Sequence, residues 1–191
     1  LFLGHKHCKN SIKIFCCHGR ARFPLAKIGG NVHIGACFFK EGLHFNSSTI
    51  SGELKILKEK NKDSKYKIEK FTENIKMHVD FEMSKMRSIL IDTDNAEKFD
   101  IKIELNGCEY EKIKKDKSVL NYNDCKYFIS LFPDNEVFQP QPYEQLSVAL
   151  MNMGQDINST RVSIEKEIQY TKSLPRLIES RKEIKENSVL E

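Results

Sequence analysis

Alternating apolar and polar residues mark the middle of the chain. Residues 75–83 and 99–105 carry an apolar side chain at every second position. This period of two is typical of a β-strand with one buried and one solvated face. Shorter apolar runs at 88–91 and 126–132 predict two further strands.

Asn106-Gly107 follows the second alternating run, and Cys108 and Tyr110 then resume the alternation. Asn-Gly between two such runs is typical of a β-hairpin with a type I′ turn. Short polar connections between successive strands favour antiparallel pairing, with one face solvated and the other covered. We therefore expect an antiparallel sheet, and we recognise no internal repeat along the chain.

Helical spacing occurs on both sides of the strand region. Before it, Ile50, Leu54 and Leu57 form one apolar stripe and predict a charged helix that ends near Asn61. After it, residues 142–154 show the spacing of a second helix. The order of elements predicts an α+β domain, in which one N-terminal and two C-terminal helices flank the sheet.

The stretch 142–154 also carries the signals of both helix ends. Pro142 suits the first helical position, and Gly154 suits the residue after the last turn. A further helix is predicted after residues 157–160. Pro175 is expected to kink that helix or to split it after Ser173 or Leu174, because a proline inside a helix removes a backbone hydrogen bond.

Charge is unevenly distributed. Residues 1–40 contain seven basic residues and no acidic one, so the rest of the chain holds 24 basic and 27 acidic residues. A basic N-terminal stretch without acidic residues is typical of a mitochondrial or plastid transit peptide. We therefore interpret residues 1–44 as a leader and residues 45–191 as one domain. The longest apolar run, residues 36–39, is far shorter than the roughly 20 residues of a membrane helix, so no membrane insertion is expected.

Histidine and cysteine residues near the N-terminus allow another interpretation of this stretch, a zinc site. The candidate ligands are Cys8, Cys16, Cys17 and His18. Zinc modules usually pair ligands as C-x2–4-C, and adjacent ligands rarely reach one tetrahedral ion without strain. The spacing therefore favours a leader over a metal site.

The other two cysteines that we consider, Cys108 and Cys125, lie in strand-like segments. We expect buried thiols there rather than a disulfide framework.

Motifs of catalysis are absent from the sequence. The chain has no Gly-rich phosphate loop, no G-x-S-x-G and no H-E-x-x-H. His44 and His78 lack a plausible Ser, Cys or carboxylate partner nearby in sequence. We therefore expect a protein that is not an enzyme and needs no cofactor.

The segment FQPQPYEQLSVALMNMGQDIN (138–158) resembles a segment of the mitochondrial acidic matrix protein family, also called the mitochondrial glycoprotein family, which includes the complement-component-binding protein. The matching positions are Pro142, Leu146, Leu150, Gly154, Ile157 and Asn158. Residues 174–184 resemble the last helix of that family, with Arg176, Ile178, Glu179 and Lys182 matching in kind. Residues 103–115 resemble one of its strand pairs.

This resemblance implies a strongly twisted antiparallel sheet and a ring-shaped homotrimer in the mitochondrial matrix. It also implies a non-enzymatic, multi-ligand or chaperone-like factor that supports mitochondrial translation and oxidative phosphorylation, with mitochondrial proteins as partners. Stability as an oligomer would require buried helix stripes. The residues expected to pack helices or to form the oligomer interface are Leu54, Leu57, Leu146, Leu150, Leu174 and Leu177.

Two alternatives remain open from the sequence. In the first, the protein is a subunit or assembly factor of a large mitochondrial complex such as the ribosome, and residues 1–40 contact RNA phosphates, as cationic tails do without sequence preference. In the second, residues 1–40 form a zinc-binding module.

Overall fold

Strands occupy the first part of the chain and helices the last part. The computed structural model describes residues 2–3, 15–17, 20–35, 37–39, 41–57, 76–91, 100–115, 118–135 and 137–187. The strands are β1 (Phe2–Leu3), β2 (Phe15–Cys17), β3 (Ala21–Arg22), β4 (Lys27–Ile28), β5 (Val32–Gly35), β6 (Cys37–Phe39), β7 (Leu43–His44), β8 (Thr49–Leu57), β9 (Lys76–Asp80), β10 (Lys85–Ile91), β11 (Asp100–Glu104) and β12 (Glu109–Lys115). The helices are α1 (Tyr122–Ser130), α2 (Gln141–Asn152) and α3 (Asp156–Asn187).

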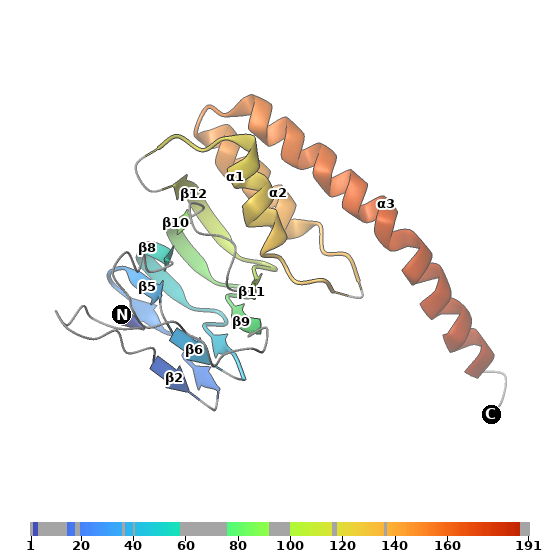
Figure 1. The fold of residues 1–191 in the computed structure, drawn as a ribbon, viewed down its shortest axis with the longest axis horizontal. Coiled ribbons are helices and arrows are strands. Elements are labelled where there is room, and N and C mark those ends of the chain that lie inside the picture. Colours follow the sequence, from blue (N-terminus) through green and yellow to red (C-terminus); the bar gives the residue numbers. More distant parts are fainter. Residues whose placement is uncertain are drawn as a thin grey trace, which may run out of the picture.

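Every pairing between these strands is parallel. One sheet has the order β1-β5-β8-β10-β12, with β4 also paired to β8, and a second has the order β11-β9-β7-β3. The short strands β2 and β6 pair with each other. From β7 to β12, consecutive strands alternate between the first and second sheets. The chain therefore winds as a β-solenoid in which each coil stacks on the coil before it (Figure 1).

One corner of the solenoid repeats in successive coils. Its four-residue unit begins with Phe23, Phe45, Phe81 and Leu105 in turn. The third residue of each unit has a positive φ, with values of 58° at Leu25, 56° at Ser47, 57° at Met83 and 68° at Gly107. The rings of Phe23 and Phe45 stack with centroids 5.1 Å apart, and those of Phe45 and Phe81 do the same. This repeat contradicts the expectation that the chain has none.

Buried rows of aliphatic side chains run across the coils inside the solenoid. In the first sheet, Val32, Leu54, Ile89 and Ile113 are aligned in register on β5, β8, β10 and β12. Each of them is at most 1% exposed. Leu43, Val79 and Ile103 form the matching row of the second sheet. The core is therefore made by stacking equivalent residues of successive coils, as in other solenoids.

Helices α1 and α2 cover the last coil. Asn121 and Asp124 form a capping box at the start of α1. Gln145 of α2 donates a hydrogen bond to the backbone oxygen of Tyr110 (2.7 Å), and the Gln141 side chain bonds the backbone at Gly107 (2.9 Å) and Cys108 (3.2 Å). The edge at β12 would otherwise leave backbone groups open to pairing with another chain, so the helices act as its cap.

Lys102 on β11 ties the cap to the second sheet. Its ammonium group donates to the backbone oxygens of Ser130 (3.1 Å) and Phe132 (3.3 Å) and pairs with Asp134 (3.3 Å). Three contacts from one side chain fix the connection between α1 and α2 against the solenoid.

The predicted antiparallel sheet is wrong, although the predicted strands at 75–83, 88–91 and 99–105 are confirmed in β9, β10 and β11. Asn106-Gly107 does not close a hairpin, because β11 and β12 belong to different sheets. A type I′ turn needs positive φ at both central residues, and of these two only Gly107 has it. The mixed α and β composition is confirmed.

Two elements have the opposite type from the one predicted. Residues 50–57, expected to be helical, lie in β8, where an extra residue between Ile50 and Glu53 shifts the register against β10. Ile50 and Leu54 are both buried, and a spacing of four residues fits the period of a strand as well as that of a helix. Residues 126–132, expected to be a strand, fall mostly in α1, whose Cys125, Phe128 and Ile129 are buried at helical spacing.

The C-terminal helices agree better with expectation. Helix α2 has a proline in its first turn and is followed by Gly154 with φ 71°, as predicted. Pro175, however, does not split the last helix, because α3 runs unbroken from Asp156 to Asn187. No helix among the described residues is both long enough and apolar enough to span a bilayer.

The boundary predicted after residue 44 falls inside the solenoid. Strands β4 and β5 pair with β8, and Val32 and Ile34 on β5 are 0% and 2% exposed. Residues 20–35 are therefore built into the same core as the residues that follow. Removal of a leader from the chain stays a prediction.

Candidate functional sites

A row of polar side chains crosses the outer face of the second sheet. Arg22, His44, Asp80 and Glu104 occupy equivalent positions on β3, β7, β9 and β11. Adjacent strands lie about 4.8 Å apart, so side chains at equivalent positions meet across the coils. The sequence intervals of 22, 36 and 24 residues between these positions hid the row from sequence reasoning.

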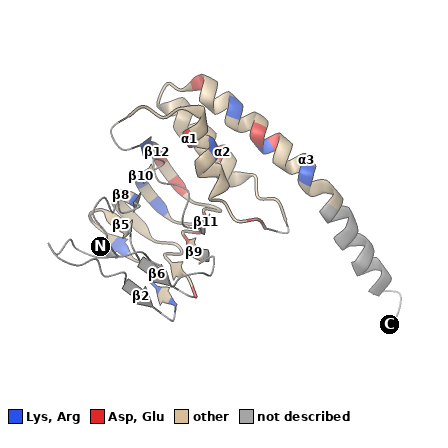
Figure 2. Ribbon diagram, viewed as in Figure 1, with Lys and Arg blue, Asp and Glu red and all other residues tan. Residues whose placement is uncertain are grey.

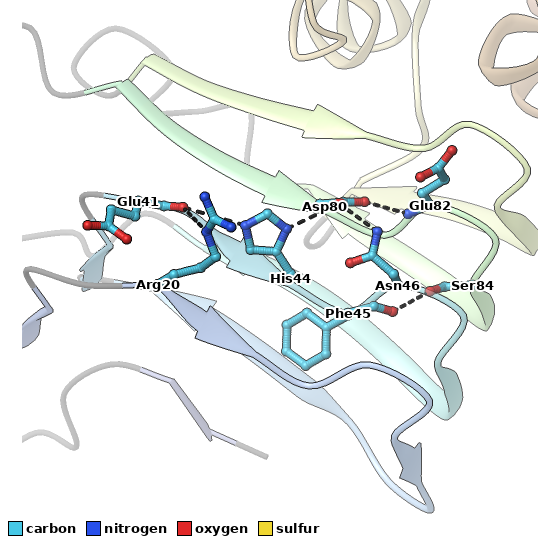
Figure 3. Close-up of polar contacts among 8 residues, drawn as sticks. All are labelled: Arg20, Glu41, His44, Phe45, Asn46, Asp80, Glu82 and Ser84. Carbon is cyan, nitrogen blue, oxygen red and sulfur yellow. Dashed lines mark hydrogen bonds and ion pairs between the residues drawn. The ribbon is translucent and has the colours of Figure 1, made fainter.

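His44 and Asp80 form the centre of this row (Figure 3). The Nδ1 atom of His44 lies 3.2 Å from Oδ2 of Asp80. Asn46 donates to the same oxygen (2.6 Å), and the backbone N–H of Glu82 donates to Oδ1 (2.8 Å). On the other side of the ring, Nε2 lies 3.5 Å from the backbone oxygen of Glu41.

A histidine–carboxylate pair is the arrangement that orients a general base in many hydrolases. Here the remaining parts of such a site are absent from the described residues: no Ser, Thr or Cys bonds to His44, and Nε2 faces a carbonyl oxygen. Asp80 instead joins three backbone or side-chain groups of two coils. The geometry therefore gives this cluster a structural role at the corner, and it explains why His44, which lacked a partner in the sequence, is paired in space.

A second polar cluster lies on the outer face of the first sheet. Glu53 on β8 pairs with Lys55 (3.2 Å) and with Lys114 of β12 (3.1 Å), and Ser88 of β10 donates to it (3.3 Å). Burial by itself raises the pKa of Glu53, but the hydrogen bonds and charges of Lys114 and Lys55 outweigh it and lower this pKa. The cluster joins three adjacent strands, and the Glu53 carboxylate is occupied by two ammonium groups and one hydroxyl.

The thiols of Cys108 and Cys125 are free and buried, as expected. Burial raises the pKa of Cys108 to about 12 and that of Cys125 to about 11, with smaller effects from Glu109 and Asp124 respectively. A thiol is nucleophilic only as the thiolate, so neither group is suited to nucleophilic or redox chemistry in the folded protein.

Helix α3 presents apolar side chains to solvent. Ile157, Ile164 and Ile168 are 71%, 56% and 41% exposed and lie on one side of the helix. The opposite side carries Ser159 and Val162, which are buried against α1 and α2. Figure 1 shows α3 leaving the cap and extending away from the solenoid. These three isoleucines form the outward stripe of α3.

The side chains of the predicted zinc ligands lie outside the described part of the structure. Cys8 and His18 lie outside the described residues, and for Cys16 and Cys17 only the backbone of β2 is described. Within the part of the chain that the structure describes, no group of three or more His, Cys, Asp or Glu side chains is arranged to hold a metal ion.

The leucines predicted to pack helices or to form an oligomer interface have different positions. Leu146 and Leu150 on α2 are fully buried in the core of the chain itself, as is Leu54, which is on a strand rather than a helix. Leu174 on α3 is half-buried. Leu57 and Leu177 lie where side chains are not described. The exposed isoleucines of α3 were not predicted as an interface, although the 3–4 spacing of Ile164 and Ile168 was visible in the sequence.

Comparison with known proteins gives no family for the chain. No protein-family model matches it, and no curated protein or solved structure matches it either.

Proposed function

We propose that the protein is a non-enzymatic assembly protein that associates with further copies of itself through the outward stripe of α3. The exposure of Ile157, Ile164 and Ile168 is the observation that carries this proposal. Apolar residues repeated on one helix face are the usual signature of helix–helix association.

The spacing along α3 suits a parallel coiled coil. Ile157 and Ile164 are seven residues apart, and Ile168 follows four residues later, which places them at the d, d and a positions of a heptad. In this frame Ser159 and Lys166 are f positions and Val162 is a b position. These positions, far from a coiled-coil seam, face the protein's own cap. Arg161, at the a position between Ile157 and Ile164, lies over the Tyr122 ring of α1 (5.1 Å), whereas the three isoleucines are exposed to solvent.

Charge favours parallel pairing over antiparallel pairing. Glu167 occupies a g position, and Lys172 occupies the e position five residues later. In parallel coiled coils a g residue meets the e residue of the next heptad on the partner, so Glu167 of one copy would face Lys172 of another. Antiparallel pairing sets g against g and loses this complementarity. Figure 2 shows acidic and basic residues interspersed along α3.

Isoleucine at a and d favours three-stranded over two-stranded coiled coils. In this frame Ile157 and Ile164 occupy d and Ile168 occupies a, with Arg161 at the preceding a position. We therefore propose a parallel trimer, in agreement with the homotrimer expected from the family resemblance. The fold lends that resemblance no support, because it implied an antiparallel sheet. The mitochondrial matrix location and the support of translation and oxidative phosphorylation remain predictions, as does RNA contact by residues 1–40.

Charge reversal on α3 tests the proposed pairing. Glu167→Lys and Lys172→Glu each place like charges across the seam, so each variant alone should associate about threefold to tenfold more weakly than the unaltered chain. In an equimolar mixture, two of the three interfaces of a mixed trimer join unlike charges and one joins like charges. The mixture should therefore recover part of the lost association, measured by sedimentation velocity. Unchanged association of both single variants, or no recovery on mixing, would contradict parallel pairing through α3.

A further inference from the structure

A cavity of about 270 Å³ lies in the helical cap, between α1, the connection to α2, α2 itself and α3. Ligand pockets for drug-sized molecules usually measure about 300–1,000 Å³, so this one suits a group of only a few heavy atoms. Its lining residues on α3, Glu165 and Gln169, are not among the three isoleucines of the outward stripe.

Two aromatic rings form part of the cavity wall. Tyr143 and Phe132 both line it, and their rings meet edge to face with centroids 5.2 Å apart. Tyr143 is only 9% exposed, yet none of the described residues forms a hydrogen bond with its hydroxyl group. Among the described residues, the buried side-chain oxygen without a partner belongs to Tyr110. The Tyr143 hydroxyl is therefore open at the cavity, where it can bond to water or to a ligand.

The charge of the wall is predominantly negative. Glu165 accepts a hydrogen bond from the neutral amide of Gln169 (2.7 Å) and has no cationic partner among the described residues. Asp134 also lines the cavity, but Lys102 already pairs with it. The ammonium group of Lys126, the cation of the wall, is 5.8 Å from the centre of the Tyr122 ring. One carboxylate is therefore left without a counter-ion.

The negative charge of the wall also keeps the Tyr143 hydroxyl protonated. Burial, followed by Glu165 and Asp134, raises the pKa of Tyr143 to about 12. The phenol is therefore neutral at physiological pH, and a neutral phenol can accept a hydrogen bond from a cation.

We propose that this cavity binds an alkylammonium group, with Glu165 as counter-ion, the Tyr143 hydroxyl as acceptor and the two rings as a cation–π surface. Aromatic rings beside a carboxylate are the usual means by which proteins hold organic cations. Anions are disfavoured by the two carboxylates. The inference does not depend on association through α3.

Titration of the full chain with n-butylammonium chloride, followed by amide NMR, tests the proposal. We expect saturable shifts for residues of the cavity, and none with 1-butanol, which has the same shape without the charge. Glu165→Gln should weaken binding about tenfold, because it removes the charge-assisted partner. Tyr143→Phe should weaken it about threefold, because it removes one neutral hydrogen bond. Glu111→Gln, an exposed change on β12, is the matched control and should have no effect.

A parallel titration with Nα-acetyl-lysine N-methylamide distinguishes the two sources of such a group. Binding of this probe as well as butylammonium would assign the site to lysine side chains of another protein. Binding of butylammonium alone would assign it to a free amine. The proposal fails if neither probe binds, if butanol binds as tightly as butylammonium, or if Glu165→Gln behaves like Glu111→Gln.

Discussion

Ser48 and Ser84 occupy the same position in two successive corners of the solenoid, and both are buried. Each hydroxyl donates to a backbone oxygen of the preceding coil, Ser48 to Phe23 (2.8 Å) and Ser84 to Phe45 (2.6 Å). The Ser84 hydroxyl also accepts the backbone N–H of Ser48 (3.1 Å). At the Ser84 corner these bonds add to the backbone bond from the Ser48 N–H to the Phe45 oxygen (3.1 Å).

Replacing Ser84 by alanine should therefore destabilise the protein. The change removes the two hydrogen bonds of this hydroxyl, at a cost of about 1–3 kcal/mol for the pair, although the Ser48 N–H still donates to the Phe45 oxygen (3.1 Å). Urea unfolding measures the difference. Ser51→Ala, at an exposed position of β8, is the control and should lie within about 0.5 kcal/mol of the unaltered chain. Equal stability of the two variants would show that the corner bonds contribute nothing.

The buried thiols predict a loss of stability at alkaline pH. Burial raises the pKa of Cys108 from its ordinary value of 9.0 to about 12 in the folded chain, so the unfolded chain loses this proton first as the pH rises. The free energy of unfolding should fall between about pH 9 and pH 12, by up to about 1.4 kcal/mol per pH unit for one thiol. Denaturant unfolding of Cys108→Ala across this range should show a shallower fall. An identical slope in both chains would rule out this linkage.

At the scale of elements, α2 holds the cap on the solenoid. Leu150 is fully buried, whereas its neighbour Met151 is 59% exposed. Leu150→Ala should cost about 2–5 kcal/mol, because it leaves a cavity between α2 and the core. Met151→Ala removes a side chain of similar size and should cost less than about 0.5 kcal/mol. Thermal unfolding measures the stability that each variant loses. Similar losses for the two variants would contradict the claim that Leu150 holds the cap on the solenoid.

Sequence reasoning identified elements where their signal is local. The strands β9, β10 and β11 follow from strict alternation, and the ends of α2 follow from Pro142 and Gly154. The strand β8 and the helix α1 were predicted as the wrong type of element. The four-residue spacing of Ile50 and Leu54 fits both periods, and the seven residues 126–132 are too few to separate a strand from a helix.

At the scale of the whole molecule, the arrangement of strands was beyond local patterns. Alternation is the same in parallel and antiparallel sheets, and strand order depends on contacts between distant residues. The corner repeat at Phe23, Phe45, Phe81 and Leu105 has unequal intervals along the sequence, so a search for a fixed period does not detect it. The cluster at His44 and Asp80 and the cavity at Tyr143 were missed for the same reason, since the winding of the chain brings their parts together.

The exposed stripe of α3 decides whether the molecule works alone or in an assembly. The helix has 32 residues, which corresponds to about 48 Å. Among the described elements, α1 and α2 make its main contacts, and Phe138 of the connection to α2 contacts Tyr170. A long helix with little tertiary support is marginal in water, so association would stabilise it.

Light scattering of the full chain at micromolar concentration measures this most directly. A parallel trimer predicts a mass of three times 22.2 kDa for the unaltered chain. Ile164→Glu/Ile168→Glu should give a single copy, because it places charges in the seam. Val148→Glu on α2, which changes an apolar residue of 50% exposure outside the seam, should stay assembled. A mass of 22.2 kDa for the unaltered chain, or assembly that survives the double change, would contradict this trimer.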